Sequence, residues 1–111
     1  MPDWSTVREL VLAYPEVEES SETSFRLRGK LVAWMSPRVE GALVVMVDRE
    51  EKELLLESNP DVYFTTPHYA NYPGILIRLE RIDPDELAER IEDAWLIRAP
   101  KRLAREFLAD E

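Results

Sequence analysis

Three apolar runs lie so close together in the sequence that only an antiparallel arrangement can join them. Phe25 and Leu27 alternate with arginines, a second run covers residues 31–35, and a third, ALVVMV, covers residues 42–47. The segments between the runs are too short for the helical crossover that parallel strands require. The third run is apolar on both faces, which is typical of a central strand. We therefore expect an antiparallel sheet with residues 42–47 near its middle.

Helical periodicity marks four further segments, and two of them carry a capping-box pattern. Asp83 is the expected N-cap of the strongest helix, with Pro84 in its first turn and Glu86 completing the box. Asp48 and Glu51 form the same pattern at a second helix. The four segments are DWSTVRELVLAY, REEKELLLES, DPDELAERIEDAWLIRA and KRLAREFLADE.

The remaining segments complete an α+β pattern. Two more strands are expected at DVYFTT and GILIRLERI, whereas the acidic segment EVEESSET, residues 16–23, is predicted to be an exposed connector. This order indicates one α+β domain over residues 1–111, with a single antiparallel sheet and helices mainly on one face. The expected core residues are Trp4, Leu27, Val45, Ile77, Ile91 and Trp95.

The balance of charge limits the partners that the chain can attract. There are 14 basic residues and 23 acidic ones, which gives a formal net charge of −9. Nucleic acids are bound largely through phosphate neutralisation by Lys and Arg, so a DNA-binding role would need its basic residues clustered. The sequence has no cysteine, no apolar run long enough to span a bilayer and no signal peptide at its N-terminus. We therefore expect a cytoplasmic protein that does not contact the membrane.

The segment TTPHYANYPG, residues 65–74, holds the only histidine of the chain and two of its four tyrosines. A proline near each end restricts the backbone, so the segment is predicted to be a stiff loop. Two interpretations remain open. His68, Tyr69 and Tyr72 either line a ligand site, or the tyrosines pack on the edge of the sheet while His68 binds a backbone carbonyl.

Basic residues gather at two places, the first of them beside a predicted strand. Arg26, Arg28 and Lys30 recur at every second position. That spacing would place all three side chains on one face of the strand. Gly29 could instead turn the chain between Arg28 and Lys30, which would break the alignment.

The second basic group lies in the first turn of the last predicted helix, at Lys101 and Arg102. The helix dipole disfavours cations there, whereas free backbone N–H groups attract anions, so the pair could form a pocket for phosphate or carboxylate. The alternative is that Glu92 and Asp93, about two turns earlier, pair with these cations at little net energy.

No catalytic or metal-binding constellation is visible in the sequence. It has no nucleophile elbow, phosphate-cradling glycine loop, kinase motif or zincin motif. With a single histidine and no cysteine, a transition-metal site has too few ligands, and the acidic segment lacks the spacing of an EF-hand. His68 could serve as a general base, but the sequence supplies no partner for it. We therefore expect a non-enzymatic protein without a cofactor or a metal.

Three stretches of the chain resemble the YjbR-type, or MmcQ-like, family. They are LAYPEVEESSETSFRLRGKLVAW, TPHYANYPGILIRL and DPDELAERIEDAWLIRAPKRL, which together span nearly the whole sequence. The resemblance implies a compact α+β fold of the frataxin (CyaY) type. It also implies a DNA-binding role, sometimes described as a double-wing arrangement, and no known enzyme activity. The positions that match the family's motifs are His68, Tyr69, Tyr72, Pro73, Trp95, Pro100, Lys101 and Arg102.

The leading hypothesis is a small, monomeric, non-enzymatic protein that binds DNA weakly through a local site. Its site would combine the loop tyrosines, as stacking surfaces, with Lys101 and Arg102, as phosphate contacts. This requires His68 to lie near the last helix, and Arg26 and Arg28 would be further phosphate contacts. The rival hypothesis is a protein-interaction or small-anion-binding module with no nucleic-acid role, which the acidic charge favours.

Overall fold

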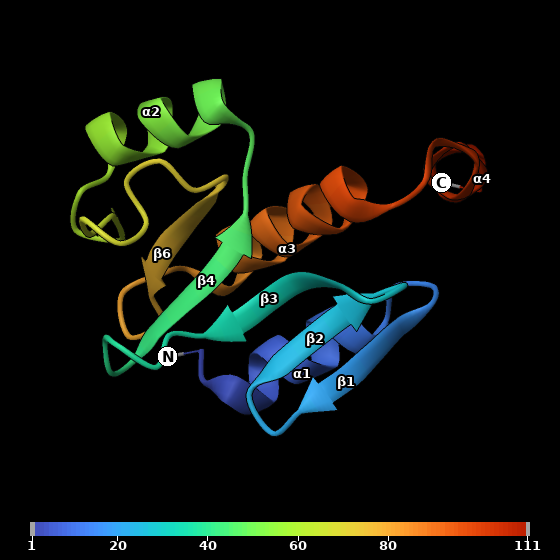
Figure 1. Ribbon diagram of the computed structural model, residues 1–111, viewed down its shortest axis with the longest axis horizontal. Helices are drawn as coiled ribbons and strands as arrows, with labels where there is room; N and C mark the ends of the chain where they lie inside the picture. Colours follow the sequence, from blue (N-terminus) through green and yellow to red (C-terminus); the bar gives the residue numbers. More distant parts are fainter. Residues whose placement is uncertain (1, 111) are drawn as a thin grey trace.

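The computed structural model describes residues 2–110, which form four helices and six strands (Figure 1). The helices are α1 (Trp4–Leu12), α2 (Arg49–Ser58), α3 (Pro84–Arg98) and α4 (Lys101–Ala109). The strands are β1 (Val17–Ser21), β2 (Ser24–Leu27), β3 (Lys30–Met35), β4 (Ala42–Met46), β5 (Tyr63–Phe64) and β6 (Gly74–Arg78). Every predicted helix and strand is present, and the α+β prediction is confirmed.

All six strands belong to one sheet, in the order β1-β2-β3-β4-β6-β5, and every neighbouring pair is antiparallel. β4 lies between β3 and β6, and each of its residues is buried. A strand that is covered on both faces can be apolar at every position, which explains the continuous run ALVVM. The prediction of a single antiparallel sheet is confirmed.

The prediction that residues 16–23 form a connector is wrong, because β1 lies within this segment and pairs with β2 at the edge of the sheet. Four of its five residues are exposed. An exposed edge strand does not need alternating apolar residues, and its charged side chains discourage pairing with another chain. Glu19 of β1 faces α1, where its carboxylate accepts two hydrogen bonds from Arg8.

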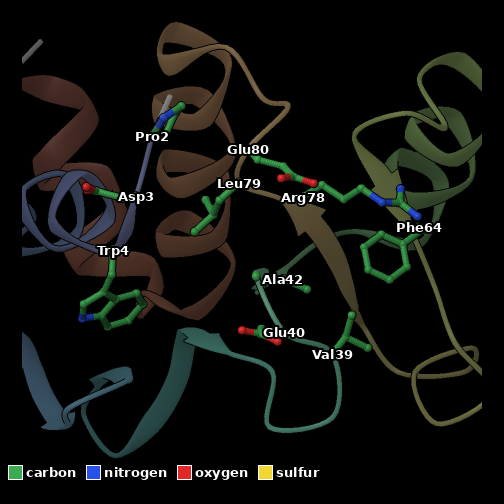
Figure 2. A pocket seen from close by; sticks show the side chains of 11 residues that line it. Pro2, Asp3, Trp4, Val39, Glu40, Ala42, Phe64, Arg78, Leu79 and Glu80 are labelled. Carbon is green, nitrogen blue, oxygen red and sulfur yellow. The ribbon is translucent and has the colours of Figure 1, made fainter.

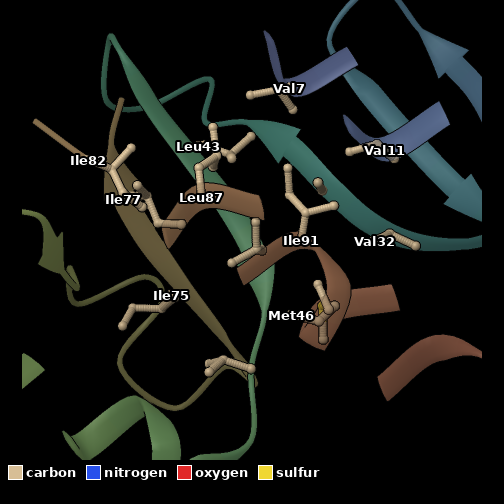
Figure 3. Close-up of a cluster of buried hydrophobic side chains, with 14 of the residues drawn as sticks. Val7, Val11, Val32, Leu43, Met46, Ile75, Ile77, Ile82, Leu87 and Ile91 are labelled. Carbon is tan, nitrogen blue, oxygen red and sulfur yellow. The ribbon is translucent and has the colours of Figure 1, made fainter. Parts of the chain in front are cut away.

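α1 and α3 pack on one face of the sheet and enclose the main core. Figure 3 shows Val7 of α1 and Ile91 of α3 converging with apolar side chains of the strands. Trp4, which was predicted to be a core residue, is only partly buried, although its ring stacks on Phe25 with the centroids 5.1 Å apart. The predicted core residues that are fully buried are Leu27, Val45, Ile77, Ile91 and Trp95.

The opposite face of the sheet carries a smaller apolar cluster. Its buried members are Ala42, Val44 and Leu76 from the strands, together with Tyr69 from the loop between β5 and β6. This loop, residues 65–73, therefore covers part of the face that no helix covers. α2 packs near β5, and α4 stands at the far end of the molecule, beyond α3 (Figure 1).

The capping box predicted for α3 is only half present. Asp83 caps the helix as expected, because its carboxylate accepts a hydrogen bond from the backbone N–H of Asp85. Glu86 does not complete the box, since its carboxylate accepts a hydrogen bond from the Tyr63 hydroxyl of β5. A tertiary contact has replaced the local one.

The box predicted for α2 is absent for the same reason. Asp48 precedes the helix with extended backbone but makes no side-chain hydrogen bond to it. Glu51 pairs with Arg90 of α3 at 3.1 Å instead of reaching back to the start of α2. The two helices are thereby joined by an ion pair.

Candidate functional site

The loop between β5 and β6 packs on the face of the sheet opposite α1 and α3. Tyr69 is only 5% exposed within the smaller apolar cluster. Tyr72 meets Trp34 of β3 edge-on, with ring centroids 6.0 Å apart. His68 is exposed, and its ring lies edge-on against the ring of Tyr69. None of residues 2–110 forms a hydrogen bond with its side chain. The tyrosines thus pack on the sheet, as one interpretation expected, but they lie on a face of the sheet rather than on its edge. Ligand contacts by these three residues stay a prediction.

Lys52 of α2, which sequence reasoning missed, holds this loop in place. Its ammonium group donates to the backbone carbonyls of Tyr69, Ala70 and Tyr72 at 2.8, 3.4 and 2.8 Å. The residue is only 7% exposed. Burial, with a smaller contribution from the charge of Arg49, lowers the pKa of Lys52. The three carbonyl acceptors offset the lost hydration. No sequence pattern distinguishes this lysine from an exposed one.

Arg28 leaves the face of β2 because the chain turns there. Arg28 and Gly29 have φ angles of 50° and 84°, the left-handed conformation that a tight two-residue hairpin turn requires. The predicted alignment of Arg26, Arg28 and Lys30 on one face is therefore broken. Arg26 donates to the Gly29 carbonyl at 2.7 Å, and Arg28 pairs with Glu16 at 2.7 Å. The hydrogen bond from Arg28 lowers the pKa of Glu16.

Lys101 and Arg102 begin α4 after Pro100, and no side chain caps this helix. Both residues are exposed. Arg102 forms an ion pair with Glu106, one turn later, at 3.3 Å. The side chains are exposed, so the pair contributes little stability. The start of α4 therefore combines uncapped backbone N–H groups with two cations, one of which already has a carboxylate partner.

The alternative prediction, that Glu92 and Asp93 pair with these cations, is wrong. Glu92 accepts a hydrogen bond from the Tyr14 hydroxyl at 3.4 Å, and Asp93 pairs with Arg90 at 3.4 Å. Residues 99–100 are extended, so α4 leaves α3 in a new direction. Helical spacing across this break no longer predicts which side chains meet.

Two of the predicted phosphate contacts do come together. Arg28 and Arg102 line one cleft of about 370 Å³ between the β2–β3 turn and the start of α4, which we call the hairpin–helix cleft. Glu16 and Glu106 line it as well, and each is the ion-pair partner of one arginine. The cleft is consequently electrically balanced, and an anion that enters it must compete with two carboxylates.

The predicted contact between the loop and the last helix is wrong. Tyr69 packs on the sheet face opposite α1 and α3, whereas Leu103 and Phe107 of α4 pack against the core on the helical side. In Figure 1 the loop (yellow) lies beside α2, and α4 (red) stands at the other end of the molecule. His68 and Lys101 therefore belong to separate surfaces, because the sheet lies between the two packing layers.

A second and larger cleft, of about 750 Å³, lies around the β3–β4 turn, and we call it the turn cleft. Figure 2 shows Trp4 on one side and Phe64 on the other, with Ala42 between them. The guanidinium of Arg78 lies over the Phe64 ring, 4.1 Å from its centroid. The lining residues are Pro2, Asp3, Trp4, Val39, Glu40, Gly41, Ala42, Phe64, Arg78, Leu79 and Glu80.

Sequence reasoning missed the turn cleft entirely. Its residues come from the start of α1, the β3–β4 turn, β5 and the end of β6. None of these segments carries a recognisable motif. The pairing of β4 with β6 and of β5 with β6, and the packing of α1 on the sheet, bring them together. The one sequence signal is Arg78, a cation that interrupts the apolar run GILIRL.

Tyr63 and Glu86 form a partly buried hydrogen bond between β5 and α3. Burial is the largest cause of the raised pKa of Tyr63, and the hydrogen bond to Glu86 and its negative charge add to the effect. Arg90 lies beside this pair and makes ion pairs with Glu51, Glu89 and Asp93. These contacts join α2, β5 and α3.

This raised pKa predicts a loss of stability in alkaline solution. The unfolded chain releases the Tyr63 proton near pH 10, whereas the folded chain retains it, so stability is intact below that pH and falls above it. We expect the free energy of unfolding to fall by about 1 kcal/mol per pH unit more in the wild type than in Tyr63→Phe above pH 10. Urea unfolding at pH 8 and at about pH 11 measures this, and parallel pH dependence of the two proteins would contradict it.

Between residues 2 and 110 no group of three or more histidine and acidic side chains is placed to hold a metal ion. The four helices described are all too short or too polar to cross a membrane. The described residues of interest thus form three separate features. They are the aromatic loop held by Lys52, the charge-balanced hairpin–helix cleft, and the larger turn cleft, which is mainly apolar with charged edges.

These features sit on a small antiparallel-sheet domain, and comparison with known proteins places that domain in a family. The chain belongs to the YjbR family, whose model matches residues 12–97. An uncharacterized protein of Mycobacterium tuberculosis strain H37Rv is 35% identical, over 99% of this chain and 98% of its own length. An uncharacterized protein of Mycobacterium bovis matches to the same extent.

A solved structure shares the fold. The crystal structure of a Deinococcus radiodurans protein with a DUF419 domain superposes with a TM-score of 0.77 at 16% sequence identity. The similarity covers 96% of this chain and 88% of that one. The family resemblance that the sequence motifs carried is therefore confirmed, and so is the fold that it implied.

Proposed function

We propose that this protein is a non-enzymatic binding module that binds a protein partner in the turn cleft. The observation that carries this proposal is the cleft itself. Its volume of about 750 Å³ falls in the range, roughly 300–1,000 Å³, of sites that bury a drug-sized ligand. Its walls are mainly apolar and include two aromatic rings, Trp4 and Phe64, with a few charged groups at the edges. That composition is typical of a binding site.

A non-enzymatic role is supported by the surroundings of the one histidine. A catalytic general base is usually oriented by a neighbouring group within hydrogen-bond reach. No side chain among residues 2–110 hydrogen-bonds to His68, which lies edge-on against the ring of Tyr69 and outside the turn cleft. The polar groups that line the cleft are carboxylates and one arginine, which can bind and orient a partner.

The test is a titration of the full chain, followed by two-dimensional ¹⁵N–¹H NMR, with blocked peptides of mixed composition. We expect at least one peptide class to shift the amide signals of Glu40, Gly41 and Leu79. Val39→Trp fills the cleft from a partly exposed position and should abolish those shifts while the far-ultraviolet circular dichroism stays unchanged. If no peptide of any composition shifts the three signals, the turn cleft is not a binding site and the proposal fails.

DNA remains a second candidate because Arg28 and Arg102 line the same cleft at the uncapped start of α4, with Lys101 beside them. Arginine and free helix N–H groups are the usual partners of phosphate. Against this, both arginines are paired with glutamates, and the net charge of −9 repels a polyanion. DNA binding through this cleft would therefore be weak and confined to a few phosphates.

The salt dependence of DNA binding tests this second candidate. With about three phosphate contacts, we expect log K against log[salt] to have a slope near −3. Replacing Arg28 and Arg102 by alanine should reduce the size of that slope by about 2, whereas Arg49→Ala on α2 should leave it unchanged. Fluorescence anisotropy with a labelled duplex and a labelled single strand measures the slope. Absence of binding at low salt would exclude the DNA-binding role.

A further inference from the structure

We propose that the occupant of the turn cleft is an extended segment of a partner protein that inserts an arginine or lysine side chain between Glu40 and Glu80, against Trp4. This inference rests on the proposed function, since it assigns the chemistry of the partner to the same cleft. It draws on the balance of charge, on the free aromatic surface and on the apolar remainder of the lining.

The charges that line the cleft favour a cation. Three acidic residues, Asp3, Glu40 and Glu80, line the cleft together with one arginine, Arg78. Glu40 and Glu80 are exposed, and within residues 2–110 neither makes a hydrogen bond or an ion pair. Asp3 accepts hydrogen bonds from Thr6 with only one of its carboxylate oxygens. The acidic groups therefore have unused capacity to accept hydrogen bonds from a ligand.

The one cation of the cleft is already committed elsewhere. Arg78 stacks on Phe64, and its Nη1 donates to the backbone carbonyls of Pro60 and Asp61 at 3.2 and 3.5 Å. In Figure 2 its guanidinium lies at the Phe64 side, away from Trp4, and Glu40 lies between the two rings. The cation of the cleft therefore leaves the Trp4 side open to a second cation.

Trp4 supplies an aromatic surface on the side of the cleft away from the Arg78 guanidinium. Its indole is nearly parallel to the Phe25 ring, with an angle of 22° between the planes, so Phe25 covers one face of it. The side chain stays partly exposed and lines the cleft with what remains. An indole face in a cleft that carboxylates also line attracts an arginine or lysine side chain through cation–π and ionic interactions together. This arrangement also accounts for a tryptophan that the core leaves partly uncovered.

The rest of the lining indicates a polypeptide rather than a free cation. Val39 and Phe64 keep partly exposed apolar surface in the cleft, and a single cation would leave a cavity of about 750 Å³ mostly empty. An extended chain with aliphatic residues on either side of the basic one would bury these surfaces as well. Aliphatic contacts supply the favourable apolar burial, and the basic side chain supplies the selectivity.

The experiment compares three blocked tripeptides, Leu-Arg-Leu, Leu-Gln-Leu and Leu-Glu-Leu, with spermidine as a free polyamine. Binding to the full chain is followed by NMR through the Trp4 indole N–H and the amides of Gly41 and Glu80. We expect Leu-Arg-Leu to bind with the highest affinity and to lose affinity as salt is added. The double variant Glu40→Gln, Glu80→Gln should weaken it by about tenfold at low salt. Trp4→Leu should weaken it by a further few-fold.

Glu57→Gln is the matched control, because Glu57 is an exposed glutamate of α2 that lines none of the clefts described above, and it should leave the affinity unchanged. If Leu-Gln-Leu shifts the cleft signals with the same affinity as Leu-Arg-Leu, the cationic partner is wrong but the turn cleft survives as a binding site. Spermidine binding as tightly as the peptide would replace the protein segment by a free polyamine and overturn the inference. Failure of all three peptides at these signals would overturn this inference, whereas the proposed function fails only if peptides of every other composition also leave the signals unchanged.

Discussion

Replacing Trp95 by alanine is expected to lower the free energy of unfolding by about 3–5 kcal/mol, the usual cost of deleting a buried tryptophan. Trp95 is completely buried on α3. Its ring packs against Phe107 of α4 and Tyr14, with centroids 4.9 and 5.6 Å away, and its Nε1–H donates to the Pro15 carbonyl at 3.1 Å. One side chain thus joins α3 to α4 and to the segment between α1 and β1. Small domains are stable by only about 5–15 kcal/mol, so the loss is a large fraction of the total.

Urea unfolding followed by circular dichroism measures this loss. Ile97→Ala on the same helix is the control, because Ile97 is exposed and its truncation should change the free energy of unfolding by less than about 0.5 kcal/mol. Trp95→Phe keeps a ring but removes the donor to Pro15, so it should lie between the two. A Trp95→Ala protein within about 1 kcal/mol of the wild type would show that this residue does not hold the three segments together.

Replacing Lys52 by methionine should cost about 2–4 kcal/mol and loosen the loop between β5 and β6. Methionine fills a similar volume but leaves the carbonyls of Tyr69, Ala70 and Tyr72 without the donor that they now share. Buried or partly buried acceptors that lose a charged donor carry a desolvation cost of about 1–3 kcal/mol each, less where water reaches them. The loop that carries Tyr69 should then leave the sheet more often and expose the apolar cluster that it covers.

Amide hydrogen exchange of residues 65–73 separates this local effect from general destabilisation. We expect those amides to exchange faster in Lys52→Met. The exchange rates of the β4 amides should change only as much as the global free energy of unfolding requires. Glu53→Met, at the next position and exposed, is the control for the added thioether. Unchanged exchange in the loop would mean that the aromatic packing of Tyr69 and Tyr72 holds it without the lysine.

The elements of the fold could be predicted from the sequence because their causes are local. The apolar runs up to residue 47 are joined by segments too short for a crossover, which leaves only antiparallel pairing. Asp83 and Pro84 mark the start of α3 because the geometry of a helix N-terminus selects these residue types within one turn. The stretches that resemble the YjbR family likewise are continuous in sequence, and the family assignment is confirmed.

Local patterns failed where a residue's partner is distant in sequence. β1 has no strand periodicity because it is an exposed edge strand, and its pairing with β2 forms it. Neither Glu51 nor Glu86 completes its capping box, because Arg90 and Tyr63, which are distant in sequence, bind these two carboxylates. A short-range rule describes the preferred local contact, but the folded chain adopts whichever contact its packing makes available.

The sequence by itself thus determined the helices, five of the six strands and the family, since each shows as a pattern within one stretch of chain. Only the tertiary structure decided which surfaces could act as sites. It separated the Tyr69 loop from Lys101 because the sheet lies between the layers in which they pack. It brought Arg28 to Arg102, and it built the turn cleft from four segments with no motif among them. Strand pairing and layer packing set those distances, and neither is encoded in the spacing of residues along one stretch of chain.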